Sequence, residues 1–165
     1  MGDILYIQSI QRYKEGDAME YDFTGKYDHQ LDEKRRIRIP SKLKGALENG
    51  YSLCVGPDRC IWVIPPETKK RIEDNFRRTS GKDVLARAAK RKVFSSIYTP
   101  EEDKQGRILL PMELAKYAGI TKDVVFVGMG NYIELWSAET FYRYDEEVEV
   151  DIGQYLDPDS GSDEV

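Results

Sequence analysis

The architecture we predict for this chain rests on the stretch LDEKRRIRIP, residues 31–40, and on its repetition as EEDKQGRILLP, residues 101–111. Each stretch has an Asp, an Arg four residues later, apolar residues at alternate positions and then a Pro. Asp32 and Asp103 stand 71 positions apart, as do the two Arg residues and the two Pro residues. Such a pattern is typical of two strands joined by a charged turn. The chain therefore carries the same charged hairpin twice.

The similarity continues on both sides of this hairpin, and it divides the chain into two repeats, residues 25–70 and 97–143. In each repeat we expect a strand, the charged turn, a strand, a short helix that begins after Pro, and a second hairpin. The segment between the repeats, residues 71–96, forms a helical linker. It belongs to a stretch with helical spacing that is split into two pieces at the pair Ser80-Gly81.

Neither repeat can bury both faces of a sheet alone, because each has only four short strands. We expect the repeats to intertwine, so that hairpins from each complete the other and close a single small barrel. The predicted fold class is mainly β with short helices, an α+β protein. The two charged turns would then be neighbours at one end of the barrel.

The formal net charge of −5 conceals an uneven distribution. Residues 23–143 hold 23 basic and 16 acidic side chains, whereas residues 144–165 hold nine acidic side chains and no basic one. A basic body is compatible with a nucleic-acid partner. Residues 69–92 alone carry ten Lys or Arg against three Asp or Glu, which favours either a solvated helix face or a supplementary phosphate-contacting surface.

The charged turns are the candidate binding site. Strand alternation places Ile37 and Ile39, which match Ile108 and Leu110, on the core face, and it places Arg36 and Arg38 on the opposite face. An Asp four residues before an Arg can hold its guanidinium, which then loses less side-chain entropy on binding a phosphate or a guanine edge. The alternative is an ion pair that only closes the turn. The predicted DNA-binding residues are Lys34, Arg35, Arg36, Arg38, Lys104 and Arg107, supported by Asp32 and Asp103.

We expect no catalytic residue, no metal site and no cofactor. The single imidazole, His29, lies on a predicted strand, where a packing or surface role is commoner than catalysis. Cys54 and Cys60 align with aromatic residues of the other repeat, and we interpret them as small apolar packing residues. No apolar run is long enough to span a membrane and no secretory signal is evident, so the expected location is cytoplasmic. A non-DNA oligomeric scaffold or an antitoxin-like protein-interaction module stays open as the alternative function.

The motifs GKYDHQLDEKRRIRIPSKLK and DKQGRILLPMELAKYAGITKDVVFVGMGNYIELWSAETF resemble the MraZ family, bacterial relatives of AbrB/SpoVT transcription factors, over residues 25–143. The resemblance implies a double-split, swapped-hairpin barrel built within one chain, ring-like homo-oligomers and nucleoid association. It also implies binding to double-stranded DNA at short repeated promoter boxes ahead of the protein's own operon of division and cell-wall genes, usually as a repressor. The family's Asp-x-x-x-Arg residues correspond to Asp32 with Arg36 and to Asp103 with Arg107.

One departure from the family lies in the first turn. The family commonly has Gly just before the motif Arg, and the second repeat keeps Gly106, but the first repeat has Arg35. If that position needs a positive φ, a side chain there costs on the order of 1 kcal/mol. Either the first turn has another shape, or an added cation at the DNA offsets the strain.

The two ends of the chain also depart from the family. The stretch KEGDAM, residues 14–19, is what a ribosome-binding sequence ahead of a start codon would encode, so we expect Met19 to be the natural start. The alternative is that residues 1–22 form a true flexible N-terminal extension. The acidic tail, residues 144–165, is expected to be disordered at least from Asp157. It either keeps a basic protein soluble or competes with DNA for the charged turns.

Overall fold

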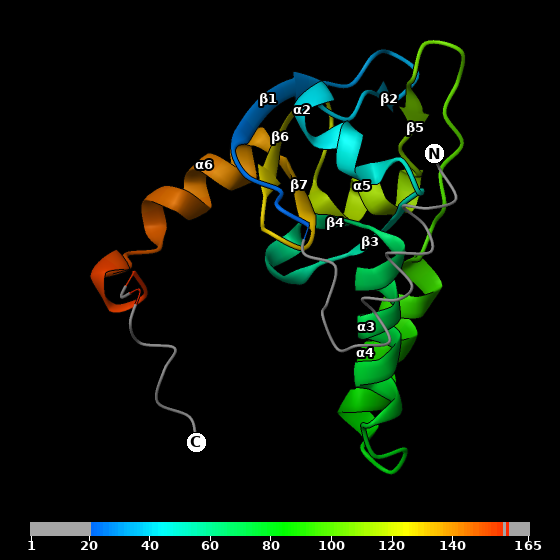
Figure 1. Ribbon diagram of the computed structural model, residues 1–165, viewed down its shortest axis with the longest axis vertical. Coiled ribbons are helices and arrows are strands. Elements are labelled where there is room, and N and C mark those ends of the chain that lie inside the picture. Colours follow the sequence, from blue (N-terminus) through cyan, green and yellow to red (C-terminus); the bar gives the residue numbers. More distant parts are fainter. Residues whose placement is uncertain (1–20, 157, 159–165) are drawn as a thin grey trace.

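The computed structural model describes residues 21–156 and 158 (Figure 1). It is a mixed α+β structure with antiparallel sheets and short helices. The start expected at Met19 and most of the extension, residues 1–20, lie outside the described residues. Residues 157 and 159–165 of the acidic tail lie outside them as well. In the part of the chain that the structure describes, no helix is long and apolar enough to cross a membrane.

The first repeat supplies four strands, and a short helix begins directly after Pro40, as predicted. A 3-10 turn continues this helix, and a second 3-10 turn joins the last two strands. These elements are β1 (Lys26–Gln30), β2 (Arg36–Ile37), α2 (Ser41–Lys44), η1 (Gly45–Leu47), β3 (Ser52–Val55), η2 (Pro57–Arg59) and β4 (Ile61–Ile64).

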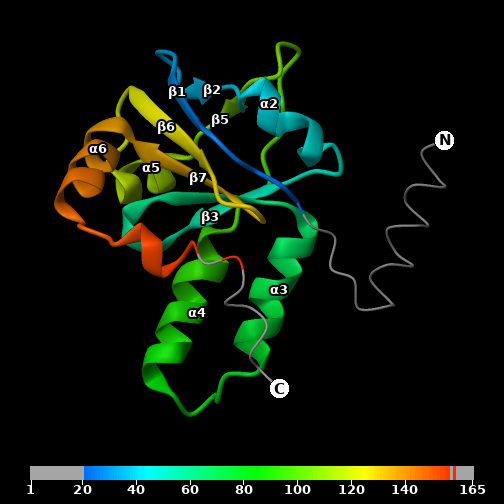
Figure 2. The same cartoon turned by 60° about the vertical axis from the view of Figure 1, so that its left-hand side comes forward.

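The linker forms two helices, α3 (Pro66–Arg77) and α4 (Val84–Ser96), with the predicted break between them. Asp83 caps α4, since its side chain accepts a hydrogen bond from the Ala86 N–H at 3.1 Å. The two helices project from the body as a hairpin, which both views show (Figures 1 and 2). They start from β4 and return to the bridge at Tyr98, so only their base meets the sheet.

The second repeat follows the same order of elements, with one strand shortened. Its elements are β5 (Ile108–Leu109), α5 (Met112–Ala118), β6 (Asp123–Gly128) and β7 (Ile133–Ser137), followed by α6 (Ala138–Glu147) and a 3-10 turn, η3 (Ile152–Gln154). The predicted first strand of this repeat is reduced to one bridge, between Tyr98 and Leu53. Pro100 has no amide N–H to extend the pairing. Helix α6 also runs past the boundary expected at residue 144.

The sheets combine strands from both repeats. The larger sheet has the order β1-β6-β7-β4-β3, so strands of the first repeat lie on both sides of β6 and β7 from the second. Strands β2 and β5, one from each repeat, pair antiparallel as a separate sheet with Ile37 opposite Ile108. The expected closed barrel is wrong for the described residues, because β1 and β3 are the two ends of the larger sheet and do not pair with each other. Strands β2 and β5 are only two residues long and stop before Pro40 and Pro111.

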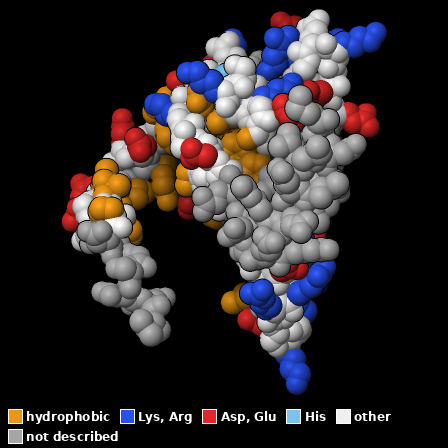
Figure 3. Space-filling model, in the orientation of Figure 1, with side chains coloured by type: hydrophobic (Ala, Val, Ile, Leu, Met, Phe, Trp, Pro, Cys, Tyr) orange, Lys and Arg blue, Asp and Glu red, His pale blue; other side chains and the backbone are white. Residues whose placement is uncertain are grey.

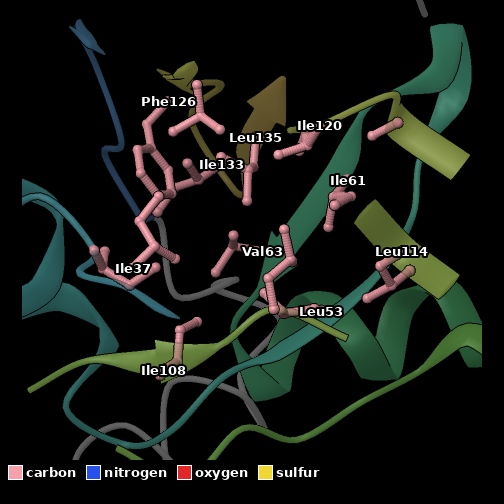
Figure 4. Packing of buried hydrophobic residues seen from close by; sticks show 14 of the residues in the cluster. Ile37, Leu53, Ile61, Val63, Ile108, Leu114, Ile120, Phe126, Ile133 and Leu135 are labelled. Atoms are coloured by element: carbon pink, nitrogen blue, oxygen red, sulfur yellow. The ribbon is translucent and has the colours of Figure 1, made fainter. Parts of the chain in front are cut away.

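One apolar core joins the larger sheet, the β2–β5 pair, α2 and α5. Figure 4 shows Ile37 and Ile108 from the small sheet pointing toward Val63, Phe126 and other residues of the large one. The four residues predicted to face the core after the two turns are all buried: Ile37, Ile39, Ile108 and Leu110. This packing fixes the base of both charged turns.

The other face of the large sheet is covered by helices. Cys60, Val125 and Trp136 are buried there beside Phe141 of α6. Cys54 and Cys60 are both buried free thiols, and burial raises the pKa of Cys54 to about 12. The pKa of Cys60 is also raised, first by burial and then by the nearby Glu134 carboxylate. A thiol with a raised pKa holds little thiolate at neutral pH, which agrees with the packing role predicted for these residues.

Candidate nucleic-acid interface

The two charged turns have the same backbone geometry. In the first, the Asp32 N–H donates to the Arg36 carbonyl at 2.9 Å, and the Asp32 carbonyl accepts from the Arg35 N–H at 3.0 Å. In the second, the corresponding bonds of Asp103 measure 2.8 and 2.9 Å. Each Asp side chain also accepts from the backbone N–H two residues later and four residues later, at 2.8–2.9 Å. The Asp side chain therefore organises its own turn.

The third residue of each turn adopts a left-handed backbone conformation. Gly106 has φ +73° and Arg35 has φ +57°. Of the two explanations left open by the sequence, a different shape for the first turn is thus excluded. Arg35 accepts a conformation that costs a non-Gly residue about 1–2 kcal/mol. Its Nε donates to the Leu110 carbonyl at 3.4 Å, so the side chain reaches across to the other repeat.

The turns are joined to each other through their charged side chains. Within each turn the Arg Nε donates to the Asp carboxylate, at 2.7 Å for Arg36 with Asp32 and at 2.8 Å for Arg107 with Asp103. Across the turns, Arg107 Nη1 lies 3.6 Å from Asp32 Oδ2, and Arg36 Nη1 lies 4.0 Å from Asp103 Oδ2. Each guanidinium is therefore placed by carboxylates of both repeats. The prediction that the two turns are neighbours is confirmed.

The same contacts keep both carboxylates ionised. The backbone N–H of Arg36 lowers the pKa of Asp32 below its ordinary value, assisted by the Arg36 guanidinium and the Lys34 N–H. The backbone N–H of Arg107 lowers the pKa of Asp103, assisted by the Arg107 guanidinium and the Gln105 N–H. With two cations and two anions, this four-residue cluster has no net charge. A surplus of positive charge must therefore come from the residues around it.

The surrounding cations are exposed at the same end of the molecule. Lys34, Arg38 and Lys104 are exposed, and Arg35 is half-buried. Figure 3 shows Lys and Arg side chains gathered over the end that carries β2 and β5. The side chains of Arg36 and Arg107 keep 31% and 24% of their surface exposed, enough for an edge of each guanidinium to reach a ligand. The structure thus brings all six predicted DNA-binding residues to one surface, the paired-turn surface.

One cation beside this surface was missed by the sequence analysis. Lys44, in the last turn of α2, forms an ion pair with Glu102 at 2.8 Å. Its Nζ also lies close to the second turn, since a Cβ added at Gly106 would be 3.1 Å from it. Lys44 has no counterpart in the second repeat, where α5 has Ala115 at the matching position. The one sequence feature that points to Lys44 is its position as a basic residue at the end of a predicted helix.

The basic linker helices do not join this surface. Helices α3 and α4 extend from the opposite end of the body, and both views place their tip far from β2 and β5 (Figures 1 and 2). His29 lies on β1 with its ring edge-on to that of Phe126, and the two ring centroids are 5.6 Å apart, which is a packing contact. The candidate interface therefore consists of the two turns and the strands that hold them.

Comparisons with known proteins match both repeats. A family model described as "MraZ protein, putative antitoxin-like" matches residues 23–92 and again residues 93–153. A protein of Symbiobacterium thermophilum named Transcriptional regulator MraZ is 41% identical over 123 residues, which are 74% of this chain and 89% of the relative. Proteins of the same name from Heliobacterium modesticaldum and Clostridium tetani are each 39% identical over 124 residues, 75% of this chain and 87% of each relative.

Proposed function

This chain belongs to the MraZ family, and from that membership we propose that it is a transcriptional regulator that binds double-stranded DNA through the paired-turn surface. The name of its relatives supports regulation of transcription. The geometry of the two turns supports DNA as the ligand. The protein is proposed not to be an enzyme.

The observation that carries this proposal is the cross-bracing of Arg36 and Arg107 by Asp32 and Asp103. An ion pair that only closes a turn needs no more than the contact between the Arg and the Asp of that turn. Here each guanidinium is also oriented by the other repeat, at an exposed edge surrounded by further cations. Such pre-orientation lowers the entropy lost when a guanidinium forms two parallel hydrogen bonds to a guanine or a phosphate.

The residues of the surface divide into two roles. Arg36 and Arg107 are proposed to read base edges in the major groove, which admits a two-stranded ribbon. Lys34, Arg35, Arg38 and Lys104 are proposed to contact phosphates and so fix the register of the turns on the duplex. Asp32 and Asp103 hold the readers and make no DNA contact themselves. Arg35 keeps its strained backbone because it adds a cation to this surface.

The proposal extends to assembly and to the regulated genes. One protomer presents one small surface, so repeated boxes bind tightly only if several protomers act together. We therefore propose a ring-like homo-oligomer, in which each chain has the hairpins of its two repeats swapped with each other. It acts in the cytoplasm on the nucleoid and represses its own operon of division and cell-wall genes at short direct repeats.

A gel-shift experiment tests this function. The full chain is titrated into the duplex upstream of its own gene and into a scrambled duplex of equal length. We expect tighter binding to the natural duplex, and an affinity that falls with salt by a log–log slope of about −0.9 per contacted phosphate. Equal affinity for both duplexes, or an affinity insensitive to salt, would overturn the proposal.

A second candidate is an antitoxin-like protein-interaction module, favoured by the description of the family model. In that case the paired-turn surface would hold an acidic protein partner. The same titration separates the two functions, because a module of this kind gives no shift on the natural duplex above that on the scrambled one. The non-DNA scaffold predicts the same outcome.

A further inference from the structure

The segment that follows α6 exposes its apolar side chains. Residues 148–156, here called the C-terminal arm, alternate apolar and acidic residues at their start. The exposed fractions are 61% for Val150, 59% for Ile152, 76% for Tyr155 and 71% for Leu156. Figures 1 and 3 show the arm carried by α6 away from the body, with apolar side chains along it. A contiguous exposed apolar stretch of this kind is typical of an interaction site.

A groove of matching character lies elsewhere in the same chain. It has a volume of about 440 Å³ and lies between α3, α4 and the β3–β4 hairpin. Its walls are mostly apolar, and they include Cys54, Val55, Trp62, Ile72, Phe76 and Val93. Trp62 Nε1 is buried and makes no hydrogen bond to any described residue. Gly56 covers this atom, since a Cβ added at Gly56 would lie 2.6 Å from it, so Trp62 contributes only its apolar ring to the groove.

The charges of the C-terminal arm and of the groove are also complementary. Helix α4 carries four basic residues and no acidic one: Arg87, Lys90, Arg91 and Lys92. Lys92 itself lines the groove. The arm and the last turn of α6 carry five acidic residues and no basic one: Asp145, Glu146, Glu147, Glu149 and Asp151. An acidic, apolar arm therefore complements an apolar groove with a basic wall.

We propose that the C-terminal arm of one copy of this chain docks in the α3–α4 groove of a second copy. The second copy is required because the arm leaves the body at α6 and stands clear of the chain's own α3 and α4 (Figure 1). The apolar side chains of the arm fill the groove. Its acidic residues lie against α4. This contact is separate from the paired-turn surface.

Photo-crosslinking of the full chain, without DNA, tests this contact. A photoreactive phenylalanine analogue replaces Ile152, isotope-labelled and unlabelled copies are mixed, and the cross-linked peptides are identified by mass spectrometry. We expect cross-links to peptides of α3, α4 or β3, including pairs that combine one labelled and one unlabelled copy. Absence of cross-links to these elements would overturn the proposal, as would cross-links to β2 or β5. Pairs formed only within one copy would overturn the role of a second copy.

A matched pair of variants in α4 controls for surface charge. Ala88 and Ala89 are adjacent and exposed, but only Ala89 lines the groove. Ala89→Glu places a charge in the apolar groove and is expected to lower the cross-link yield by about tenfold. Ala88→Glu adds the same charge to α4 outside the groove and is expected to lower the yield much less. Equal yields from the two variants would contradict docking in this groove, whatever the gel shifts show about DNA.

Discussion

At the residue scale, the two turns differ in backbone strain at Arg35. It holds φ +57° at the position where Gly106 holds φ +73°. Arg35→Gly relieves about 1–2 kcal/mol of backbone strain and loses about 0.4–1 kcal/mol through the freer unfolded chain. We therefore expect a net gain in the free energy of unfolding, measured by chemical denaturation, together with weaker binding to any duplex.

The reverse change serves as the control for this prediction. Gly106→Ala introduces a Cβ at positive φ and brings it 3.1 Å from Lys44 Nζ, so it should lower the free energy of unfolding. Should Arg35→Gly destabilise the protein as Gly106→Ala does, the strain assigned to the first turn would be wrong.

The two Asp residues predict a loss of stability in acid. Because their pKa values are lowered in the folded protein, they stabilise it above the ordinary Asp pKa of about 3.9. This stabilisation is lost as the pH falls through the lowered values. Thermal melting between neutral pH and strong acid should therefore show a steeper loss in the wild type than in Asp32→Asn/Asp103→Asn. Parallel curves would show that the carboxylates do not hold the turns.

At the element scale, the structure separates two basic regions that composition alone groups together. The turns lie at one end of the molecule and the α3–α4 tip at the other (Figures 1 and 2). Lys34→Ala/Lys104→Ala removes two exposed cations from the turns and should weaken binding to natural and scrambled duplex alike. Arg78→Ala/Lys82→Ala removes two exposed cations from the linker and should leave both affinities unchanged. Fluorescence anisotropy at fixed salt measures both, and equal losses would place DNA on the helices as well.

The sequence correctly predicted those elements that depend on local patterns of residues. Alternation correctly assigned Ile37 and Ile108 to the core face, and Pro40 and Pro111 marked the helix starts. The duplication predicted that the turns are neighbours. The closed barrel failed because its closure depends on edge pairing between distant strands, which no local pattern encodes. Cross-bracing between repeats and the approach of Lys44 to Gly106 are tertiary contacts of the same kind.

At the scale of the whole molecule, one protomer offers a single paired-turn surface built from both repeats. If several protomers are linked in one assembly, affinity for several boxes should therefore exceed affinity for one box. Light scattering at micromolar concentration should give a mass above that of one chain, and gel shifts should favour duplexes with more boxes. A monomeric mass, or equal affinity for one box and for several, would contradict this assembly.

The central claim is that Arg36, held by Asp32 and Asp103, reads the bases of the repeated boxes. Three variants are compared by gel shift on the boxes and on scrambled duplex, with thermal melting as the control for folding. Arg36→Ala should abolish the preference for the boxes and weaken the binding free energy for them by about 1–3 kcal/mol. Arg107→Ala should lose less, because fewer cations support its turn, and Arg38→Ala should weaken both duplexes equally.

Arg36→Lys gives the most direct measurement, since a lysine can still pair with the two carboxylates but cannot form the forked contact of a guanidinium. The account predicts that Arg36→Lys melts close to the wild type and binds scrambled duplex as well as the wild type does, yet no longer prefers the boxes. Retention of the wild-type preference by Arg36→Lys and Arg36→Ala would contradict it, and would leave Arg36 as a brace of the turn alone.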